Sequence, residues 1–431
     1  MTSKPARILT TVLTLGAITF SLSMRLHAQT ETTLYTFAKD ANGYNPVASL
    51  TFDAAGNLYG TTSEGGNTGT KCSSPGCGVV FQLSPGSGGT WTETLLHTFT
   101  GGKDGANPFV GLTADSSGNF YGTTGNGGST IGNPAGWGTI FKLSPNSTGG
   151  WTKTFVHTFT GGRDGADPYG NLILDSAGNI YGTAHTAGDP SCFCGLVFKL
   201  SPISGAGWKE TVLHTFKGAD GSHPSASLVF DSAGNLYGTT SFGGKGCTVG
   251  ICGSGTAFEL SPTSTGGWKE TVLHYFINQA DGGYPASSLV FDAAGNLYGT
   301  TTQGGNFSGS CFSGCGTVFE LSPLSTGAWK ETTLHQFTFS DGSQPQAGLV
   351  LAPNGNLYGT ASQSTAGCGV VFQLSPASAG SWAEATTYNF TCFNDGASPQ
   401  ATLITDQAGN LYGTTSIGGA NGAGVVFEIT P

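Results

Sequence analysis

The sequence predicts an all-β fold, a seven-bladed β-propeller with four antiparallel strands in each blade. A unit of about sixty residues recurs seven times, no window shows helical periodicity, and the last unit lacks the strand that precedes the first. Because radial repetition leaves only short sheet edges, such units favour a propeller over a sandwich. An open solenoid of the same units is the alternative.

The repeat is centred on the phrase Gly-Asn-Leu-Tyr-Gly-Thr-Thr, which recurs with small changes. Successive copies lie 54 to 62 residues apart, too short to bury a core alone and long enough for four strands. The asparagines of the phrase are Asn57, Asn119, Asn179, Asn235, Asn296, Asn356 and Asn410.

The fourth unit illustrates the expected strands. Residues 227–230 form an apolar run that ends in a turn containing Gly234, and residues 236–240 follow as the second strand. A loop rich in Gly, Ser and Cys leads to the third strand at residues 256–260. Residues 268–276 alternate between polar and apolar side chains and form the fourth strand.

The two ends of the chain predict closure of the ring. A fourth-strand sequence stands at residues 33–37, before any full unit, and the last unit stops after its third strand at residues 425–429. The N-terminal strand 33–37 can therefore complete the last blade, so that no blade is left open.

The first 28 residues have the features of an export signal peptide. Lys4 and Arg7 form a positive n-region, residues 8–24 are apolar and uncharged, and a small residue stands at the expected cleavage point. A retained membrane anchor is the alternative. We expect removal of residues 1–28 and a single propeller domain at residues 29–431, extracellular and not inserted in a membrane.

The charge of the chain argues against nucleic acid as a partner. Removal of the signal leaves 12 basic against 25 acidic residues, a formal charge of −13. An acidic protein is repelled by phosphate backbones and by anionic membrane surfaces. We expect the mature protein to be a monomer.

The units resemble the GloVer tandem repeat of exported bacterial proteins. The shared motifs are Asp-Gly-x-x-Pro, Gly-Asn-Leu-Tyr-Gly-Thr-Thr and Gly-x-Val-Phe-x-Leu-Ser-Pro, and they cover essentially the whole mature chain. The resemblance implies an extracellular location and a propeller-like fold, and it implies no activity. Members of that family carry varied C-terminal anchors, whereas no anchor follows the last repeat here, so we expect free secretion.

One face of the disc is the predicted binding surface. In each blade the loop between the second and third strands and the link to the next blade emerge on the same face, the loop face, and variable loops on a rigid repeat favour binding specificity. A ring of link aspartates could hold cations or a basic ligand, but each Asp could instead cap its own turn ahead of Gly. These aspartates are Asp104, Asp164, Asp220, Asp281, Asp341 and Asp395, with Asp40 loosely equivalent.

Two further loop-face residues depart from the repeat pattern. Glu64 is one of the few acids that are not repeated, and Trp137 is the only tryptophan in a variable loop, which makes it a candidate for stacking on a ligand. The repeated tryptophans are expected to cover the rim between blades. The repeated fourth-strand histidines share their position with Tyr35 and Tyr388, so they are expected to serve packing or hydrogen bonding.

Ten cysteines in an exported chain predict disulfides. The expected pairs are Cys72–Cys77, Cys247–Cys252, Cys311–Cys315 and Cys368–Cys392. Cys192 and Cys194 remain, and His185 and His223 come from adjacent blades on the same face. These four residues form a zinc-type ligand set, with a disulfide beside two solvated histidines as the alternative. A divalent metal is thus the one cofactor suggested, and none is required.

The leading functional hypothesis is a secreted, non-catalytic propeller that engages a glycan, a protein or a cell-envelope partner through its loop face. The alternative is an extracellular enzyme of the lyase, lactonase or glycosidase type, with its site at the mouth of the central channel. A structural component of an outer matrix is a third hypothesis. We assign no catalytic residue, because nearly every acid and histidine belongs to the repeat and no Gly-x-Ser-x-Gly, His-Glu-x-x-His or phosphate-loop motif occurs.

Overall fold

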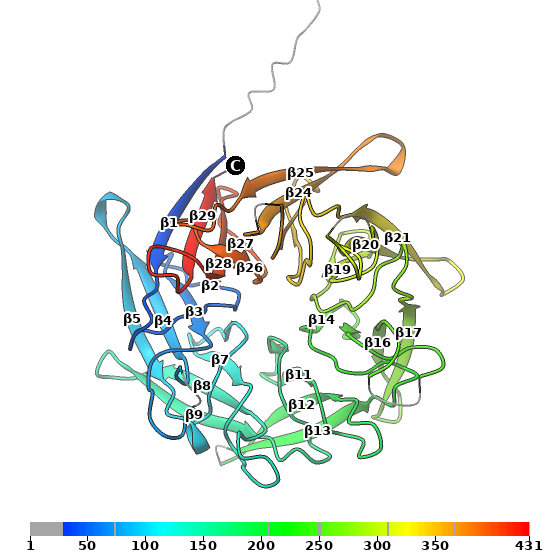
Figure 1. Ribbon diagram of the computed structural model, residues 1–431. Helices are drawn as coiled ribbons and strands as arrows, with labels where there is room; N and C mark the ends of the chain where they lie inside the picture. Colours follow the sequence, from blue (N-terminus) through cyan, green and yellow to red (C-terminus); the bar gives the residue numbers. More distant parts are fainter. Residues whose placement is uncertain are drawn as a thin grey trace, which may run out of the picture.

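The computed structural model describes residues 29–72, 75–205, 207–247, 251–307, 310–365 and 367–430, and the expected signal peptide at residues 1–28 lies outside them. Within the described ranges the chain forms seven antiparallel sheets arranged in a ring (Figure 1). The prediction of a seven-bladed propeller is confirmed. No helix in these ranges has the length and apolar character needed to cross a bilayer.

Blades 1 to 6 are four-stranded sheets, with the strands in chain order from the axis to the rim. Blade 1 consists of β2 (Thr51–Phe52), β3 (Leu58–Thr62), β4 (Val79–Pro85) and β5 (Trp91–Thr98). Blade 2 consists of β6 (Thr113–Ala114), β7 (Phe120–Thr124), β8 (Thr139–Pro145) and β9 (Trp151–Thr158). Blade 3 consists of β10 (Ile173–Leu174), β11 (Ile180–Ala184), β12 (Leu196–Ile203) and β13 (Gly207–Thr215).

The next three blades repeat this pattern. Blade 4 consists of β14 (Val229–Phe230), β15 (Leu236–Thr240), β16 (Thr256–Pro262) and β17 (Trp268–Tyr275). Blade 5 consists of β18 (Val290–Phe291), β19 (Leu297–Thr301), β20 (Thr317–Pro323) and β21 (Trp329–Gln336). Blade 6 consists of β22 (Val350–Leu351), β23 (Leu357–Ala361), β24 (Val370–Pro376) and β25 (Trp382–Asn389).

Blade 7 closes the ring with both ends of the chain. It consists of β26 (Ala397–Pro399), β27 (Ile404–Thr405), β28 (Leu411–Ile417), β29 (Val425–Thr430) and the N-terminal strand β1 (Thr30–Thr36). β1 pairs antiparallel with β29, from Thr30 opposite Thr430 to Thr36 opposite Val425. The predicted closure is confirmed, although the strand begins three residues before the predicted range 33–37.

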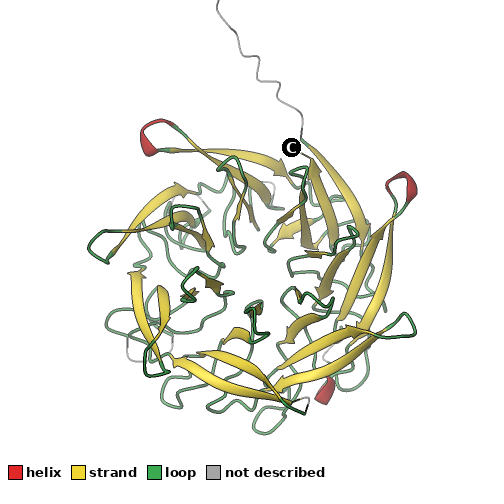
Figure 2. Ribbon diagram, turned by 180° about the vertical axis from the view of Figure 1, so that it is seen from behind, coloured by secondary structure: helices red, strands yellow, loops and turns green. Residues whose placement is uncertain are grey.

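Short 3₁₀ turns are the only helical elements in the described ranges. They are η1 (Ser87–Gly89), η2 (Gly102–Asp104) and η3 (Ser378–Gly380). η1 and η3 lie at the tips of hairpins that join a third to a fourth strand, and these hairpins project from the rim (Figure 2).

The hydrophobic core lies between neighbouring blades, and a glycine in each second strand makes room for it. A Cβ atom on Gly238 would lie 2.8 Å from Cζ of Phe258, so the phenylalanine ring packs directly on the glycine backbone. Phe216, at the end of the preceding blade, meets Phe258 edge-on with ring centroids 5.2 Å apart. The buried clusters therefore join two blades each, as residues of blades 3 and 4 do here.

Repeated polar contacts hold adjacent blades together. Thr239 Oγ1 donates to the carbonyl of Ser287 in the next link at 3.1 Å, and Thr414 Oγ1 closes the circle by donating to Ala48 O at 3.1 Å. On the rim, Trp329 lies 6.0 Å from Tyr237 of the preceding blade, which confirms that the repeated tryptophans cover the blade boundaries.

Five disulfides link the described cysteines. The four expected pairs are confirmed, including Cys368–Cys392, which ties a variable loop to a link. Cys192 pairs with Cys194, as the disulfide alternative predicts. No described cysteine is free, and this disulfide content suggests an oxidising, extracellular environment.

Candidate functional site

The loop face is built from links that are fixed at both edges. Each link forms an antiparallel bridge to the end of the second strand of the blade it enters, as Ser222 does with Phe242. It is also bonded to the previous blade, since the His223 N–H donates to Cys194 O at 2.8 Å. Links and variable loops therefore share one face, as the sequence predicts.

The residue before each link proline has a left-handed backbone, with φ between 53° and 59°. This conformation costs a residue other than Gly or Asn about 1–3 kcal/mol and persists only where the surroundings hold it. We call these residues the pre-proline ring: Asn45, Asn107, Asp167, His223, Tyr284, Gln344 and Ser398. Because the backbone repeats while the side chain changes, the ring is a framework that displays variable side chains.

Aromatic and imidazole rings form a continuous chain over blades 2 to 5. The centroids of Phe109 and Tyr169 are 5.6 Å apart, and each later step is between 4.8 and 5.4 Å. We call this chain the aromatic arc: Phe109, Tyr169, His185, His223, Phe242 and Tyr284. Most contacts are edge-to-face, one of the arrangements that aromatic pairs prefer.

The two histidines at the centre of the arc are close together and differ in their partners. Burial and the neighbouring His223 lower the pKa of His185 to about 4, so its imidazole is neutral at physiological pH. His185 Nδ1 is buried and has no hydrogen-bond partner among the described residues, whereas His223 Nδ1 lies 2.6 Å from Ser222 Oγ. A buried polar atom without a partner is a natural contact for a ligand.

Beside the histidines, burial raises the pKa of two oxygen acids. Burial raises the pKa of Asp167, whose Oδ2 accepts a hydrogen bond from Thr186 Oγ1 at 2.7 Å. Burial raises the pKa of Tyr169 to about 12, so its phenol remains protonated and can donate a hydrogen bond. The protonated phenol of Tyr169 and the neutral imidazole of His185 therefore lie together beside the Phe109 ring on this part of the loop face.

Amide and hydroxyl side chains occupy the links of blades 6, 7 and 1. They are Gln344, Gln346, Ser398, Gln400 and Asn45. The channel along the propeller axis is lined from all seven blades and encloses about 90 Å³, room for a few waters at about 30 Å³ each. No histidine or carboxylate is among its described lining residues. A ligand larger than water would thus bind at the mouth.

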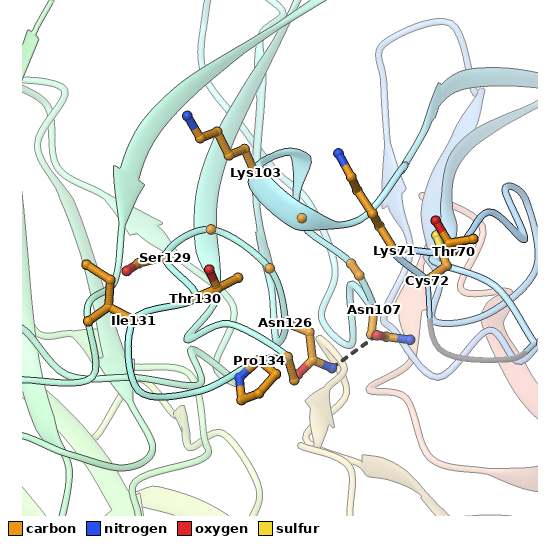
Figure 3. Close-up of a pocket in the computed structure, with 15 residues that line it drawn as sticks. Thr70, Lys71, Cys72, Lys103, Asn107, Asn126, Ser129, Thr130, Ile131 and Pro134 are labelled. Atoms are coloured by element: carbon orange, nitrogen blue, oxygen red, sulfur yellow. Dashed lines mark hydrogen bonds between the residues drawn. The ribbon is translucent and has the colours of Figure 1, made fainter.

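A second hollow, the rim cavity, lies between blades 1 and 2 (Figure 3). It has a volume of about 870 Å³, and Lys71 and Lys103 extend in the same direction along it. Asn126 Nδ2 donates to Asn107 Oδ1 at 3.0 Å on its opposite side. Its described lining residues include two lysines and no acid, although the chain as a whole is acidic.

The predicted link aspartates cap their own turns, and most of them also bind the fourth strand. Asp341 Oδ1 accepts the Thr338 N–H at 2.8 Å, while Oδ2 lies 3.2 Å from His335 Nε2. Equivalent backbone bonds are made by Asp104, Asp164, Asp220, Asp281 and Asp395. These contacts match the capping alternative, and a role for the six carboxylates in ligand binding stays a prediction.

Trp137 and Glu64 occupy different parts of the loop face. The Trp137 indole N–H donates to Ile131 O at 2.8 Å, and its ring packs against Gly161, where a Cβ atom would lie 2.3 Å from Cε2. The Trp137 carbonyl accepts a hydrogen bond from the Asp167 N–H of the following link, as the Cys77 carbonyl does from the Asn107 N–H. Trp137 therefore occupies the position that a disulfide-bonded cysteine has in blade 1, and it secures its loop. Glu64 bridges to Tyr44 beside the pre-proline ring. Ligand contacts by both residues stay predictions.

The predicted metal ligands are brought together only in part. His185 and His223 are adjacent, with centroids 4.8 Å apart, and Cys192 and Cys194 are joined to each other as a disulfide. Zinc binding by His185, Cys192, Cys194 and His223 would need both thiolates, so metal analysis still has to test that prediction. The disulfide alternative was wrong in one respect, because His185 is largely buried rather than solvated.

The aromatic arc and the pre-proline ring were not assigned from the sequence. Their signal was present, because the residue before each link proline changes from blade to blade while the surrounding motif is constant. Two arc members, His185 and His223, stood out as departures from the repeat, but they were interpreted as metal ligands and not as neighbours of the aromatic residues.

These features define a seven-bladed propeller that displays variable side chains from a repeated framework on one face. The chain belongs to the Gloeobacter/Verrucomicrobia repeat family, whose model matches residues 16–188, 69–312, 193–377 and 306–431. The family resemblance expected from the motifs is thus confirmed.

Two solved structures that are similar to this chain each share 13% sequence identity with it. A luciferin-regenerating enzyme has a TM-score of 0.44, and the match covers 74% of this chain and 90% of that one. A protein of unknown function from Dyadobacter fermentans has a TM-score of 0.45, with 84% and 98% covered. No curated protein matches.

Proposed function

We propose that this chain is a secreted, non-catalytic carbohydrate-binding protein that holds a glycan at the mouth of its axial channel. The observation behind the proposal is the aromatic arc, which faces links of amide and hydroxyl side chains across that mouth. The expected signal peptide and the five disulfides support secretion.

The chemistry of the two sides suits a sugar. Apolar C–H faces of a pyranose pack on aromatic rings, and the hydroxyl groups exchange hydrogen bonds with amides, phenols and neutral imidazoles. His185 has a buried nitrogen available for such a bond. The narrow channel supports binding at the surface, where an extended chain can cross the mouth.

The enzyme alternative receives less support from the same region. Glycosidases need two carboxylates placed around the bond to be cleaved. The described lining of the channel offers none, and Asp167 is the one carboxylate within the pre-proline ring. The proposal therefore favours binding without turnover.

A glycan array with the mature, disulfide-bonded protein tests the proposal. Phe109→Ala and Phe242→Ala remove arc rings that lie at the surface and are partly exposed, 37% in the case of Phe109, so folding should survive. We expect each variant to lose about tenfold in affinity for the bound glycan, the effect of one lost stacking contact. Phe312→Ala removes a ring that is 92% exposed outside the arc and is the matched control.

Two results would contradict the proposal. Unchanged binding by both arc variants would remove the arc from the site. Recovery of a cleaved glycan after incubation with the wild-type protein would instead favour the enzyme alternative.

A further inference from the structure

The boundaries between blades bring a third group of side chains together on the rim. Each boundary combines His or Tyr from the outermost strand of one blade, Asp from the link, and Glu or Lys from the outermost strand of the next blade. Between blades 5 and 6 these residues are His335, Asp341 and Glu384, and one ligand atom from each lies within 4.8 Å of the others. They come from β21, the link and β25, so the cluster spans two blades.

The equivalent boundary between blades 1 and 2 contains a cation of the protein's own. Lys153 replaces the glutamate there, and its buried ammonium lies 2.7 Å from Asp104 Oδ1. The same ammonium also donates to the carbonyl of Asp104, and His97 Nε2 lies 3.2 Å from Asp104 Oδ2. This position in the fold therefore accommodates a positive charge held by a carboxylate and flanked by an imidazole.

At the boundary of blades 5 and 6 the positive side chain is missing and a second carboxylate takes its place. Two half-buried carboxylates that face each other repel unless a cation or a proton lies between them. The related boundaries leave Glu210 Oε1 and Glu270 Oε1 buried without a partner among the described residues.

We propose that His335, Asp341 and Glu384 bind a first-row divalent metal ion, Zn²⁺ or Mn²⁺, that joins blade 5 to blade 6. One imidazole nitrogen with two carboxylates suits these ions, whereas Ca²⁺ and Mg²⁺ prefer oxygen ligands alone. The Thr338 N–H bond to Oδ1 of Asp341 orients the carboxylate so that Oδ2 faces the imidazole. The site is independent of the glycan proposal, because it lies on the rim.

Metal content and thermal unfolding of the mature protein test the proposal. The protein is treated with chelator, dialysed, and supplied with ZnCl₂, MnCl₂ or CaCl₂. Glu384→Lys copies the arrangement of Lys153 and should fold, because this fold already carries it. Glu320→Lys makes the same charge change outside the cluster and copies Lys142, its equivalent in blade 2.

We expect saturating Zn²⁺ or Mn²⁺ to raise the Tm of the wild-type protein by about 2–4 °C. The Glu384→Lys protein should bind one ion fewer per chain, and Glu320→Lys should bind as many ions as the wild type. Equal metal content in the wild-type and Glu384→Lys proteins would overturn the proposal, as would an equal loss in Glu320→Lys. If Glu384→Lys does not fold, His335→Tyr replaces it, since Tyr388 occupies that position in blade 6.

Discussion

Substitution of Tyr284 tests whether the pre-proline ring holds its backbone whatever side chain it displays. Tyr284 has φ 57°, a conformation that costs an L-residue about 1–2 kcal/mol and costs Asn less. Tyr284→Asn copies Asn45 and Asn107, so it relieves strain but loses the edge contact with Phe242 at 5.3 Å, worth about 0.5–1.5 kcal/mol. The two effects oppose each other, and we expect the free energy of unfolding to change by less than about 1 kcal/mol.

Tyr284→Val is the matched comparison, because it loses the same aromatic contact and gains no relief. A β-branched side chain is strongly disfavoured at positive φ, so the Val variant should be less stable than the Asn variant by about 2 kcal/mol. Urea unfolding of the mature protein, followed by circular dichroism, measures both values. Equal stability of the Asn and Val variants would refute the reasoning, since the backbone at Tyr284 would then carry no strain.

The same pair of variants separates folding from binding. Both remove the Tyr284 ring from the aromatic arc, so both should lose the same affinity for the glycan identified on the array, although their stabilities differ. An affinity that follows stability rather than the presence of the ring would place Tyr284 outside the binding surface.

Three further predictions concern packing, protonation and a disulfide. Gly238→Ala should cost about 1–3 kcal/mol of unfolding free energy, because the new Cβ atom would lie 2.8 Å from Phe258; combination with Phe258→Leu should recover part of the loss. Burial raises the pKa of Glu93 from 4.5 to about 7, so the folded protein binds a proton that the unfolded chain releases, and this contribution is lost as the pH rises through 7. Between pH 5 and 8 the unfolding free energy measured in urea should therefore fall by about 1–2 kcal/mol more in the wild type than in Glu93→Gln, a difference reduced for the partial exposure of Glu93. Identical pH profiles of the two proteins would contradict this prediction. Joint replacement of Cys368 and Cys392 by Ser should lower the unfolding free energy by about 3 kcal/mol, because that bridge closes 24 residues, and a loss below 1 kcal/mol would argue against an entropic role.

Most of the architecture follows from local signals that agree with one another. The phrase Leu-Tyr-Gly-Thr-Thr combines β-forming residues with one glycine, and the glycine matches the phenylalanine that recurs in the third strand, as Gly238 matches Phe258. The isolated strand at residues 33–37 predicted closure because an unpaired edge is unfavourable, and β1 does pair with β29. Its first three residues were missed, because Thr30 and Glu31 are polar and only the pairing with β29 extends the strand.

The site was harder to predict because its geometry is set by tertiary contacts. Trp137 was singled out as the one tryptophan in a variable loop, yet its indole lies against Gly161, a residue 24 positions later in the next link. Conversely, Tyr169 and His185 meet only because the bridge between Ala166 and Thr186 aligns link and loop. Neither contact can be predicted from the spacing of these residues along the sequence.

The seven blades share one backbone, so a comparison of side chains at equivalent positions separates residues that the fold requires from residues that serve function. Where the backbone is constant and the side chain is constant, as with the tight-turn carboxylate of Asp53 that binds Asn57 and Tyr59, the residue serves the blade. Blade 6 supports this, since it folds the same turn with Ala352 and retains the backbone bond to Asn356. Where the backbone is constant and the side chain changes its chemistry, the requirements of the fold do not explain the change. Tyr284 and Asn45 share one strained conformation and differ in chemistry, so the proposed contact of the Tyr284 ring with a sugar is a reason for the difference that lies outside the blade.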